Sequence, residues 1–400
     1  MRKQEIPILI AVFLDLVGFG MAFPDVQLRA QHLGASGPII GILLASLFAV
    51  QFLVSPRWGA LSDRIGRKPI AVFCTVLSAV SMLVYASTDS LWGILASRIL
   101  GGFAAANVVV AQAYMADITA EKERGAVMGR IGAAISVGLI GGPFIGGQLA
   151  QAGGSSLLGY VAASASGLGA LMLLFGMKGT PPKEKREPGR APIIDIRLLR
   201  DLPDLRPMFV LAAVAWFALA CLEGTFGRLI DYKFAFPLHD LGLSFTKPQG
   251  ASGAVFGLES LISFAIQGLL YAWIASRVNF RHLLRFGFVM QGIGLILTPF
   301  APGLGLIFLF SSIYSAGGAL ANPTVNTICS NLVPENRQGE LFGLLQAARS
   351  IGFLLGPLIG GALFDVSPYA PYILAGGVAT VAALLVPRGR AQGPGAITVA

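Results

Sequence analysis

Apolar stretches of about twenty residues alternate with short polar segments along nearly all of this 400-residue chain. A helix needs about 20 apolar residues to cross the hydrocarbon core of a bilayer, so each stretch predicts one membrane-spanning helix. The pattern predicts twelve spans, at residues 6–28, 37–56, 69–88, 91–116, 126–150, 156–177, 207–230, 250–273, 283–301, 303–327, 338–364 and 369–387.

The second half of the sequence repeats part of the first. Residues 121–149 align with residues 335–363, and most of the shared positions are glycines or prolines inside apolar stretches. A repeat displaced by about half the chain indicates two homologous halves, which is typical of membrane transporters with a binding site where the halves meet. The predicted fold is therefore an all-α membrane protein with two pseudo-symmetric six-helix bundles.

Four segments follow from this pattern. Residues 1–177 and 207–387 are the predicted bundles, residues 178–206 the cytoplasmic linker between them, and residues 388–400 a cytoplasmic tail. Within the linker, Ile194, Leu198 and Leu202 share one helical face, which favours a short helix on the membrane surface. A flexible tether with a few apolar residues explains the same stretch equally well.

Composition and charge agree with a membrane protein. Hydrophobic residues make up 55% of the chain, charged residues only 12%, and the mean hydropathy is +0.73, whereas soluble proteins have about 25% charged residues. The net charge of +9 does not indicate nucleic-acid binding, because most of the 29 Lys and Arg residues fall in segments on one side of the membrane. The positive-inside rule then places both termini in the cytoplasm.

A charged loop lies between the second and third predicted spans, with the sequence G-A-L-S-D-R-I-G-R-K at residues 59–68. Gly66 permits a tight turn, and Asp63 and Arg67 can bond helix ends or charges across a moving interface. A basic loop that only fixes the topology would explain the charges equally well.

This loop resembles the signature loop of the major facilitator superfamily, in which it is a cytoplasmic latch. Asp117, which closes the fourth span, resembles that family's partner acid, so the resemblance implies a latch of Asp63, Arg67 and Asp117 that holds the outward-open form. The corresponding loop of the second half, residues 276–281, lacks the acid and the glycine, which predicts a one-sided latch. The implied gating residues are Gly59, Asp63, Arg64, Gly66, Arg67, Lys68 and Asp117.

A glycine-proline motif lies in the fifth span, and the eleventh span carries a partial copy of it. Proline should kink the helix, and the regularly spaced glycines make a groove for close packing. A hinge or packing seam is a sufficient reading of these residues alone. The motif also resembles one associated with proton-coupled exporters of the superfamily. The predicted hinge residues are Gly138, Gly142, Pro143, Gly146 and Gly147.

Ionisable residues buried inside predicted spans each cost at least about 2.5–3.5 kcal/mol and need a function or a partner. Those predicted to couple transport to protons are Asp15, Arg98, Glu223 and Glu259. An apolar environment favours the neutral carboxyl group, which suits it to bind and release protons. The sequences around Asp15 and Arg98 are similar to those of tetracycline and multidrug efflux proteins of the superfamily. Static ion pairs or side chains that reach the interface remain the alternative.

Further polar residues in the second half are predicted to bind substrate. Glu259, Ser263 and Gln267 share one helical face, although hydrogen bonds between helices would explain them equally well. No acid occurs in the ninth or tenth span, which weakens a tetracycline assignment. The predicted substrate-binding residues are Gln267, Asn322, Asn326, Gln346 and Arg349.

Energising and catalytic motifs are absent from the sequence. It has no phosphate-binding loop for ATP, and its three histidines and three cysteines are scattered, so we expect neither an enzyme nor a metal site nor a cofactor. The resemblance implies proton-driven export of small amphipathic, cationic or zwitterionic drug-like compounds by a monomer in the inner membrane. The alternatives are uptake of a metabolite, or a membrane receptor that transports nothing.

Overall fold

The computed structural model describes residues 5–105, 107–119, 124–179, 197–334 and 337–387. Most of the predicted linker and the whole predicted tail lie outside these ranges. The helices of the first half follow the predicted spans closely. They are α1 (Glu5–Met21), α2 (Phe23–His32), α3 (Gly37–Ile65), α4 (Arg67–Ser87), α5 (Leu91–Ala104), α6 (Asn107–Ile118) and α7 (Arg124–Gly176).

The second half repeats this helical pattern and adds one hairpin. Its elements are α8 (Arg197–Asp201), α9 (Leu205–Lys233), β1 (Leu238–Asp240), β2 (Leu243–Phe245), α10 (Pro248–Phe264), the π-helix η2 (Ala265–Leu270), α11 (Tyr271–Ala275), α12 (Phe280–Leu297), the 3-10 helix η3 (Thr298–Phe300), α13 (Leu304–Leu332), α14 (Gln338–Val366), α15 (Ala370–Ala382) and the 3-10 helix η5 (Ala383–Leu385).

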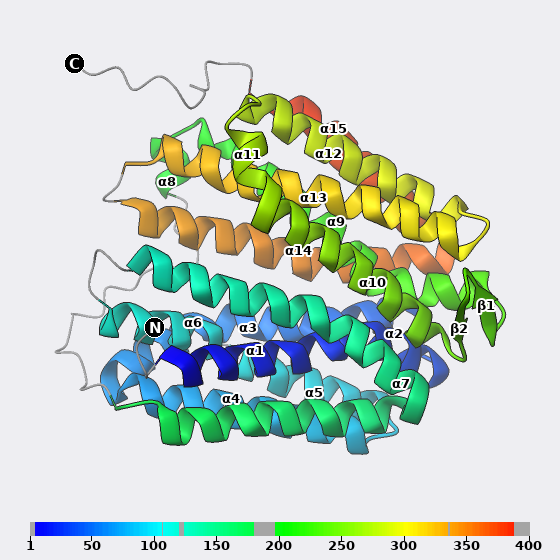
Figure 1. Cartoon of the computed structure of the whole chain (residues 1–400), viewed down its shortest axis with the longest axis horizontal. Helices are drawn as coiled ribbons and strands as arrows, with labels where there is room; N and C mark the ends of the chain where they lie inside the picture. The colour runs from blue at the N-terminus through cyan, green and yellow to red at the C-terminus, as the bar shows by residue number, and fades with distance from the viewer. Residues whose placement is uncertain (1–4, 106, 120–123, 180–196, 335–336, 388–400) are drawn as a thin grey trace. The chain divides into compact units, whose positions relative to one another are not determined.

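Within the described residues, ten helical segments are long and apolar enough to cross a membrane, and the shorter segment Ala370–Leu385 takes the place of the predicted twelfth span. The 53 residues of α7 cover two predicted spans. At 1.5 Å per residue a straight helix of this length would measure about 80 Å, far more than the bilayer core. The chain instead reverses at Gly154, whose φ of 74° and ψ of −175° interrupt the helix, as Figure 1 shows. The elements therefore account for the twelve predicted spans.

The chain divides into two compact units. Unit 1 comprises Met1–Ile193 with Phe226–Leu238 and Phe245–Gly257, and unit 2 comprises Ile194–Thr225, His239–Ser244 and Leu258–Ala400. The end of α9 and most of α10 therefore pack with the helices of the first half. The two predicted bundles divide the chain at the linker instead, and that division stays a prediction.

Glycines of the predicted hinge hold unit 1 together by bringing α7 against α1. A Cβ atom on Gly142 would lie 2.8 Å from Gly20 Cα, and one on Gly146 would lie 2.2 Å from the Met21 carbonyl oxygen. A Cβ atom on Gly138 would likewise lie 2.9 Å from the Phe13 carbonyl oxygen. These residues form a packing seam in which only glycine fits.

The same seam recurs in unit 2 between α14 and α9. A Cβ atom on Gly352 would lie 2.6 Å from the Phe217 backbone nitrogen, and one on Gly356 would lie 2.8 Å from the Cys221 nitrogen. A Cβ atom on Gly360 would lie 2.9 Å from the Cys221 sulfur. The sequence repeat thus corresponds to the same close packing of two helices through glycines, once in each unit.

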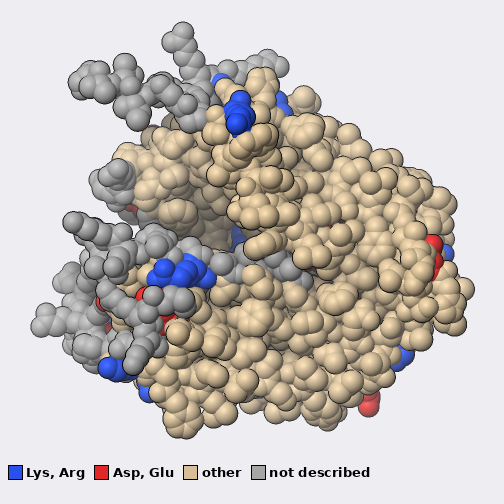
Figure 2. Space-filling view, viewed as in Figure 1, with Lys and Arg blue, Asp and Glu red and all other residues tan. Residues whose placement is uncertain are grey.

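Large apolar side chains cover the outer surface of the helices. Trp92, Phe175 and Leu269 are 80%, 81% and 71% exposed, which would be unfavourable in water but suits contact with lipid. Figure 2 shows that Lys, Arg, Asp and Glu are scarce along most of α10 and α13. The chain is a multi-pass membrane protein.

Two elements outside the spans add to what the sequence predicted, namely a β-hairpin and a short helix in the linker. The hairpin of β1 and β2 was not predicted, and its turn places Leu241 and Gly242 at φ of 54° and 73°, which fits a tight two-residue turn. In the linker, the part that is described forms the short helix α8, and Leu198 is fully buried in the core of unit 2. Ile194 lies outside the described residues.

Candidate transport site

The predicted gating loop is built around Gly66, where α3 ends and α4 begins. Its φ of 98° and ψ of 154° require glycine. The turn directs the first side chain of α4, Arg67, back beneath α3. Gly59 has open space around its Cα, Arg64 is exposed and Lys68 half-buried.

Arg67 joins the acids that the resemblance implied. It is only 7% exposed, and its guanidinium forms ion pairs with Asp63 at 2.5 Å and with Asp117 at 3.1 Å. It also donates a hydrogen bond to the Ser62 hydroxyl. The structure thus brings together the three residues of the predicted latch, from α3, α4 and α6, while their role as a latch stays a prediction.

A second ion cluster, outside the predicted spans, was not foreseen. Arg337, just before α14, pairs with Asp201 of α8 at 2.9 Å and with Glu340 at 2.7 Å. The hydrogen bonds that Arg337 donates, first to Glu340 and then to Asp201, raise its pKa above the ordinary value. This cluster ties the end of the linker to the start of α14. Sequence reading missed it because Arg337 and Asp201 lie far apart in the chain.

Asp15 is enclosed in unit 1 between α1, α6 and α7. It is 6% exposed and accepts hydrogen bonds from the Ser166 hydroxyl at 3.0 Å and from the Asn107 amide at 3.4 Å. No basic side chain forms an ion pair with it among the described residues. The arrangement offers two neutral donors to the carboxyl group, and Arg98 is not among its partners.

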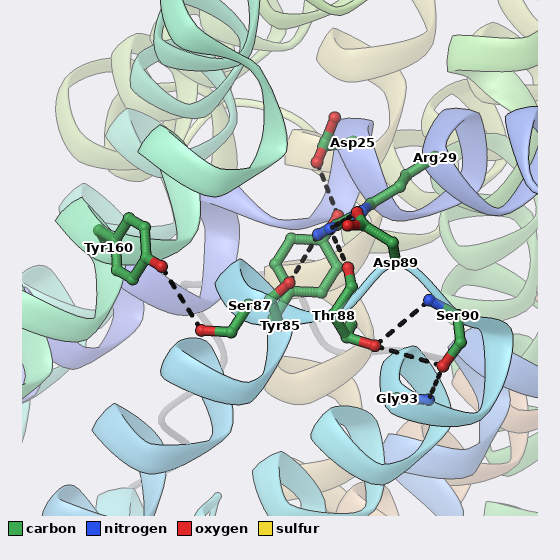
Figure 3. A network of polar contacts seen from close by, with 9 residues as sticks. All are labelled: Asp25, Arg29, Tyr85, Ser87, Thr88, Asp89, Ser90, Gly93 and Tyr160. Atoms are coloured by element: carbon green, nitrogen blue, oxygen red, sulfur yellow. Dashed lines mark hydrogen bonds and ion pairs between the residues drawn. The ribbon is translucent and has the colours of Figure 1, made fainter.

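Arg98 lies instead beside Tyr85 and the buried acid Asp25. Its guanidinium carbon is 5.1 Å from the centre of the Tyr85 ring, and the charge of Asp25 acts on it. Tyr85 donates a 2.6 Å hydrogen bond to Asp25, which is 1% exposed. Arg29 covers the same ring at 4.8 Å and donates to the carbonyl oxygens of Tyr85 and Thr88 (Figure 3). The Arg98 guanidinium therefore lies beside Asp25 and not beside Asp15.

Sequence reading missed Asp25, because it follows Pro24 near the end of a predicted span, where an acid commonly lies at the membrane surface. The signal that could have identified it as buried was its place inside the predicted span, residues 6–28. Besides Tyr85, it accepts a hydrogen bond from Gln249 of α10 at 3.2 Å. Asp25 therefore connects α4 with the part of α10 that belongs to unit 1.

A second polar contact in unit 1 joins α2 to the end of α9. Gln31 accepts a 2.8 Å hydrogen bond from Arg228 and donates one of 3.1 Å to Asp231. The side chain of Arg228 is 7% exposed. These bonds fix the end of α9 against unit 1.

In unit 2, Glu223 and Arg349 belong to one electrostatic cluster. Each charge acts on the other, and the charge of Glu223 also acts on Glu259. The Arg349 guanidinium lies over two aromatic rings, 4.5 Å from the centre of Trp216 and 5.5 Å from the centre of Phe353. Two carboxyl groups and one guanidinium thus form a single cluster in this unit, in which Glu259 is buried and Glu223 and Arg349 are half-buried.

Glu259 is 7% exposed, and its Oε1 atom has no hydrogen-bond partner among the described residues. The Ser315 hydroxyl donates to the Glu259 backbone carbonyl, and it also contacts Ser263 at 2.9 Å. Ser311 lies beside the carboxyl group. A buried carboxyl oxygen without a donor is costly, so this atom is suited to take up a proton or a ligand.

The remaining predicted substrate-binding residues are more exposed. Gln267 lies in the π-helix η2, an irregularity that is frequent at functional sites, and it is exposed, as are Asn326 and Gln346. Asn322 is half-buried next to Pro323. Within the described part of the chain, no group of three or more His, Cys, Asp or Glu side chains could hold a metal ion.

The model of the Major Facilitator Superfamily matches residues 8–268 and 224–396 of the chain. The chain belongs to this superfamily. Among its relatives are the multidrug resistance protein 2 of Bacillus subtilis, 28% identical over 376 residues (92% of this chain, 91% of that protein), and the quinolone resistance protein NorA of Staphylococcus aureus, 28% identical over 393 residues (96% of each).

Solved structures of this superfamily member's fold include the nucleoside transporter NupG, with a TM-score of 0.76 and 15% identity over 96% of this chain and 98% of that one. A bacterial homologue of the human lysosomal transporter Spinster gives a TM-score of 0.77 and 15% identity, over 96% and 95% of the two chains. At this identity the likeness establishes the fold, which is the predicted all-α arrangement.

Proposed function

We propose that this superfamily member is a secondary active transporter that exports small amphipathic drug-like compounds in exchange for protons. The names of its relatives support this proposal, since they are multidrug and quinolone resistance proteins that match nearly the full length of the chain. The observation that carries the coupling mechanism is the buried carboxyl group of Glu259. Its Oε1 atom has no hydrogen-bond partner in the part of the chain that the structure describes, and the charge of Glu223 acts on it.

Protonation would change the balance of charge in unit 2. With both carboxyl groups ionised, Glu223 and Glu259 repel each other and together attract the positive charge of Arg349 or of a cationic substrate. A proton on either carboxyl group removes part of that attraction and so favours release of the cation. Alternating access then couples the exchange to movement of the two halves. The energy source would be the proton gradient, with no cofactor.

The proposal includes a location and an orientation. The chain would reside as a monomer in the plasma membrane, with both termini in the cytoplasm, because the basic residues concentrate in the segments on that side. Arg67, Asp63 and Asp117 would then form a cytoplasmic gate, and their ion pairs would break and reform as the halves move.

Transport of ethidium into everted membrane vesicles under an imposed pH gradient tests the proposal. The wild type should accumulate ethidium only when the vesicle interior is acidic, and Glu223→Gln and Glu259→Gln should each abolish that dependence. Asp204→Asn is the matched control, because Asp204 is exposed and lies outside the spans. Gradient-driven accumulation that survives in both glutamine variants would contradict the coupling assignment, and movement in the opposite direction would indicate uptake.

A further inference from the structure

An apolar groove lies in unit 2 where α11, α12 and α13 meet. Its volume is about 490 Å³, within the range of about 300–1,000 Å³ that is usual for small-molecule sites. The groove is lined by Ile274, Val278, His282, Leu283, Phe286 and Leu320. Leu283 and Leu320 are buried, whereas Val278 and Phe286 are exposed, so the groove opens to the surface of the unit. With five apolar residues of six, it suits a hydrocarbon chain and would leave a polar ligand without partners.

The turn at one end of the groove is basic. Arg277 and Arg281 directly precede the groove residues Val278 and His282 in the sequence. Residues 260–334, which include all of α11, α12 and α13, contain no Asp or Glu. Neither Arg277 nor Arg281 is among the arginines that form ion pairs in the part of the chain that the structure describes. These charges are therefore available to an anion from outside the protein.

Arg277 is held at the end of the span by Trp273. Its guanidinium lies 4.1 Å from the centre of the Trp273 ring, and both side chains are exposed. A guanidinium stacked on a ring keeps its N–H groups at its edge, where they can bind a phosphate in bidentate geometry. Arg285 differs, because it donates a hydrogen bond to the Val386 carbonyl oxygen. Since tryptophan is typical of the depth of lipid headgroups, Arg277 lies where a phospholipid carries its phosphate.

The corresponding turn of unit 1 uses its arginine differently. There Arg67 is buried and forms ion pairs with Asp63 and Asp117. The turn of unit 2, residues 276–281, has neither the acid nor the glycine of that loop. Its arginines therefore cannot form a latch with an acid of their own loop, and the apolar groove beside them favours a lipid as their partner.

We propose that the groove binds an acyl chain of an anionic phospholipid from the bilayer and that Arg277 binds the phosphate of this lipid. Arg281 adds positive charge at the same turn. Both parts of the ligand are required, since a zwitterionic lipid supplies the chain without net charge and a soluble phosphate supplies the charge without a chain. A lipid bound here would contact three elements of unit 2, namely α11, α12 and α13, and would stabilise their packing.

Titration of the purified full-length protein with dioleoylphosphatidylglycerol, followed by native mass spectrometry, measures the affinity for the first bound lipid. One arginine near the membrane surface strengthens the binding of an anionic lipid about fivefold. Arg277→Gln should therefore lower the affinity about fivefold, and Arg277→Gln combined with Arg281→Gln about 25-fold. Dioleoylphosphatidylcholine has the same chains without net charge, so it should bind the wild type more weakly and should not respond to these substitutions.

Two controls separate the groove from a general attraction of basic loops for anionic lipid. Arg64→Gln removes an exposed arginine from the corresponding loop of unit 1 and should leave the affinity for the first bound lipid unchanged. Val278→Trp places a large ring at the exposed part of the groove and keeps every charge. It should weaken the binding of both lipids by a similar factor of about two to five. Glycerol 3-phosphate, which has no acyl chain, should not displace the lipid.

Several outcomes overturn the inference. Equal losses of affinity in Arg64→Gln and Arg277→Gln would indicate general attraction, and equal affinities of the wild type for the two lipids would contradict an anionic occupant. Displacement of the lipid by ethidium would make the groove a substrate site instead. Should Arg277→Gln fail to fold, Arg277→Lys keeps the charge and loses the bidentate geometry. Its affinity should fall about two- to threefold, and an unchanged affinity would contradict phosphate binding by the guanidinium.

Discussion

Substitution of Gly146 by alanine tests the packing seam between α7 and α1. The added Cβ atom would lie 2.2 Å from the carbonyl oxygen, 2.5 Å from Cα and 2.7 Å from the carbonyl carbon of Met21. All three are main-chain atoms, so no side chain can rotate out of the way. The two helices must instead move apart along this part of the seam.

The matched control lies in the same helix. A Cβ atom on Gly141 would meet only Ile145 Cδ1, at 3.8 Å, which is ordinary van der Waals contact. Both substitutions bring the same gain in helix propensity, about 0.8–1 kcal/mol. Overpacking costs about 1–3 kcal/mol or more. Because the propensity gain cancels between the variants, Gly146→Ala should be less stable than Gly141→Ala by about 1–3 kcal/mol.

Thermal unfolding of the detergent-solubilised protein measures the difference. Gly141→Ala should match or exceed the wild-type transition temperature, and Gly146→Ala should unfold several degrees below Gly141→Ala and lose transport. Since unfolding of a membrane protein by heat is commonly irreversible, the variants are compared at one scan rate. Equal transition temperatures for the two variants would refute the close approach of the helices at Met21.

Three further predictions concern the polar clusters. Arg67→Gln, which leaves Asp63 and Asp117 without their shared cation, should reduce ethidium transport in vesicles at least tenfold, whereas the exposed Arg64→Gln should transport nearly as the wild type. Tyr85→Phe removes one hydrogen bond to Asp25 and should lower the free energy of unfolding by about 1–2 kcal/mol, whereas Asp25→Leu also removes the acceptor of Gln249 and should lower it further; equal shifts in thermal unfolding would contradict the network. The pKa of Arg337 is raised in the folded protein, so its stabilising effect is fully present below the ordinary pKa and is lost only as the pH rises through the raised value. The difference in transition temperature between wild type and Arg337→Gln should therefore stay constant between about pH 6 and about pH 9.

The fold could be predicted from the sequence because two signals are local. A stretch of apolar residues determines a spanning helix whatever its neighbours are. Gly66 indicates a tight turn, because glycine readily adopts the backbone conformations that such a turn needs. The seam glycines carry a third signal, since small residues at a helical spacing indicate close packing. Even so, the sequence did not indicate which helix Gly142 or Gly146 would contact.

The candidate site was harder to predict because its contacts join distant parts of the chain. Asp25 meets Gln249, and Trp216 meets Arg349, only after the helices have packed. Sequence reading identified Asp15 and Arg98 as charges inside spans but did not identify their partners, and the structure places Arg98 beside Tyr85. Burial of a charge was therefore predictable, and its partner was not.

The two seams separate what the halves share from what distinguishes them. Gly146 packs on Met21 as Gly360 packs on Cys221, so the positions on α1 and α9 can be matched through the glycines that touch them. At the matched positions Trp216 corresponds to Leu16 and Glu223 to Phe23, and the sequence repeat matches Arg349 with Ile135. The adjacent Trp216 and Phe353 rings, the Arg349 guanidinium over them and the acid Glu223 therefore have no equivalent in the first half. Because close packing demands glycine in both seams, the second half could acquire these charged groups without loss of the fold. This asymmetry supports the proton coupling that we propose for Glu223 and Glu259 in unit 2.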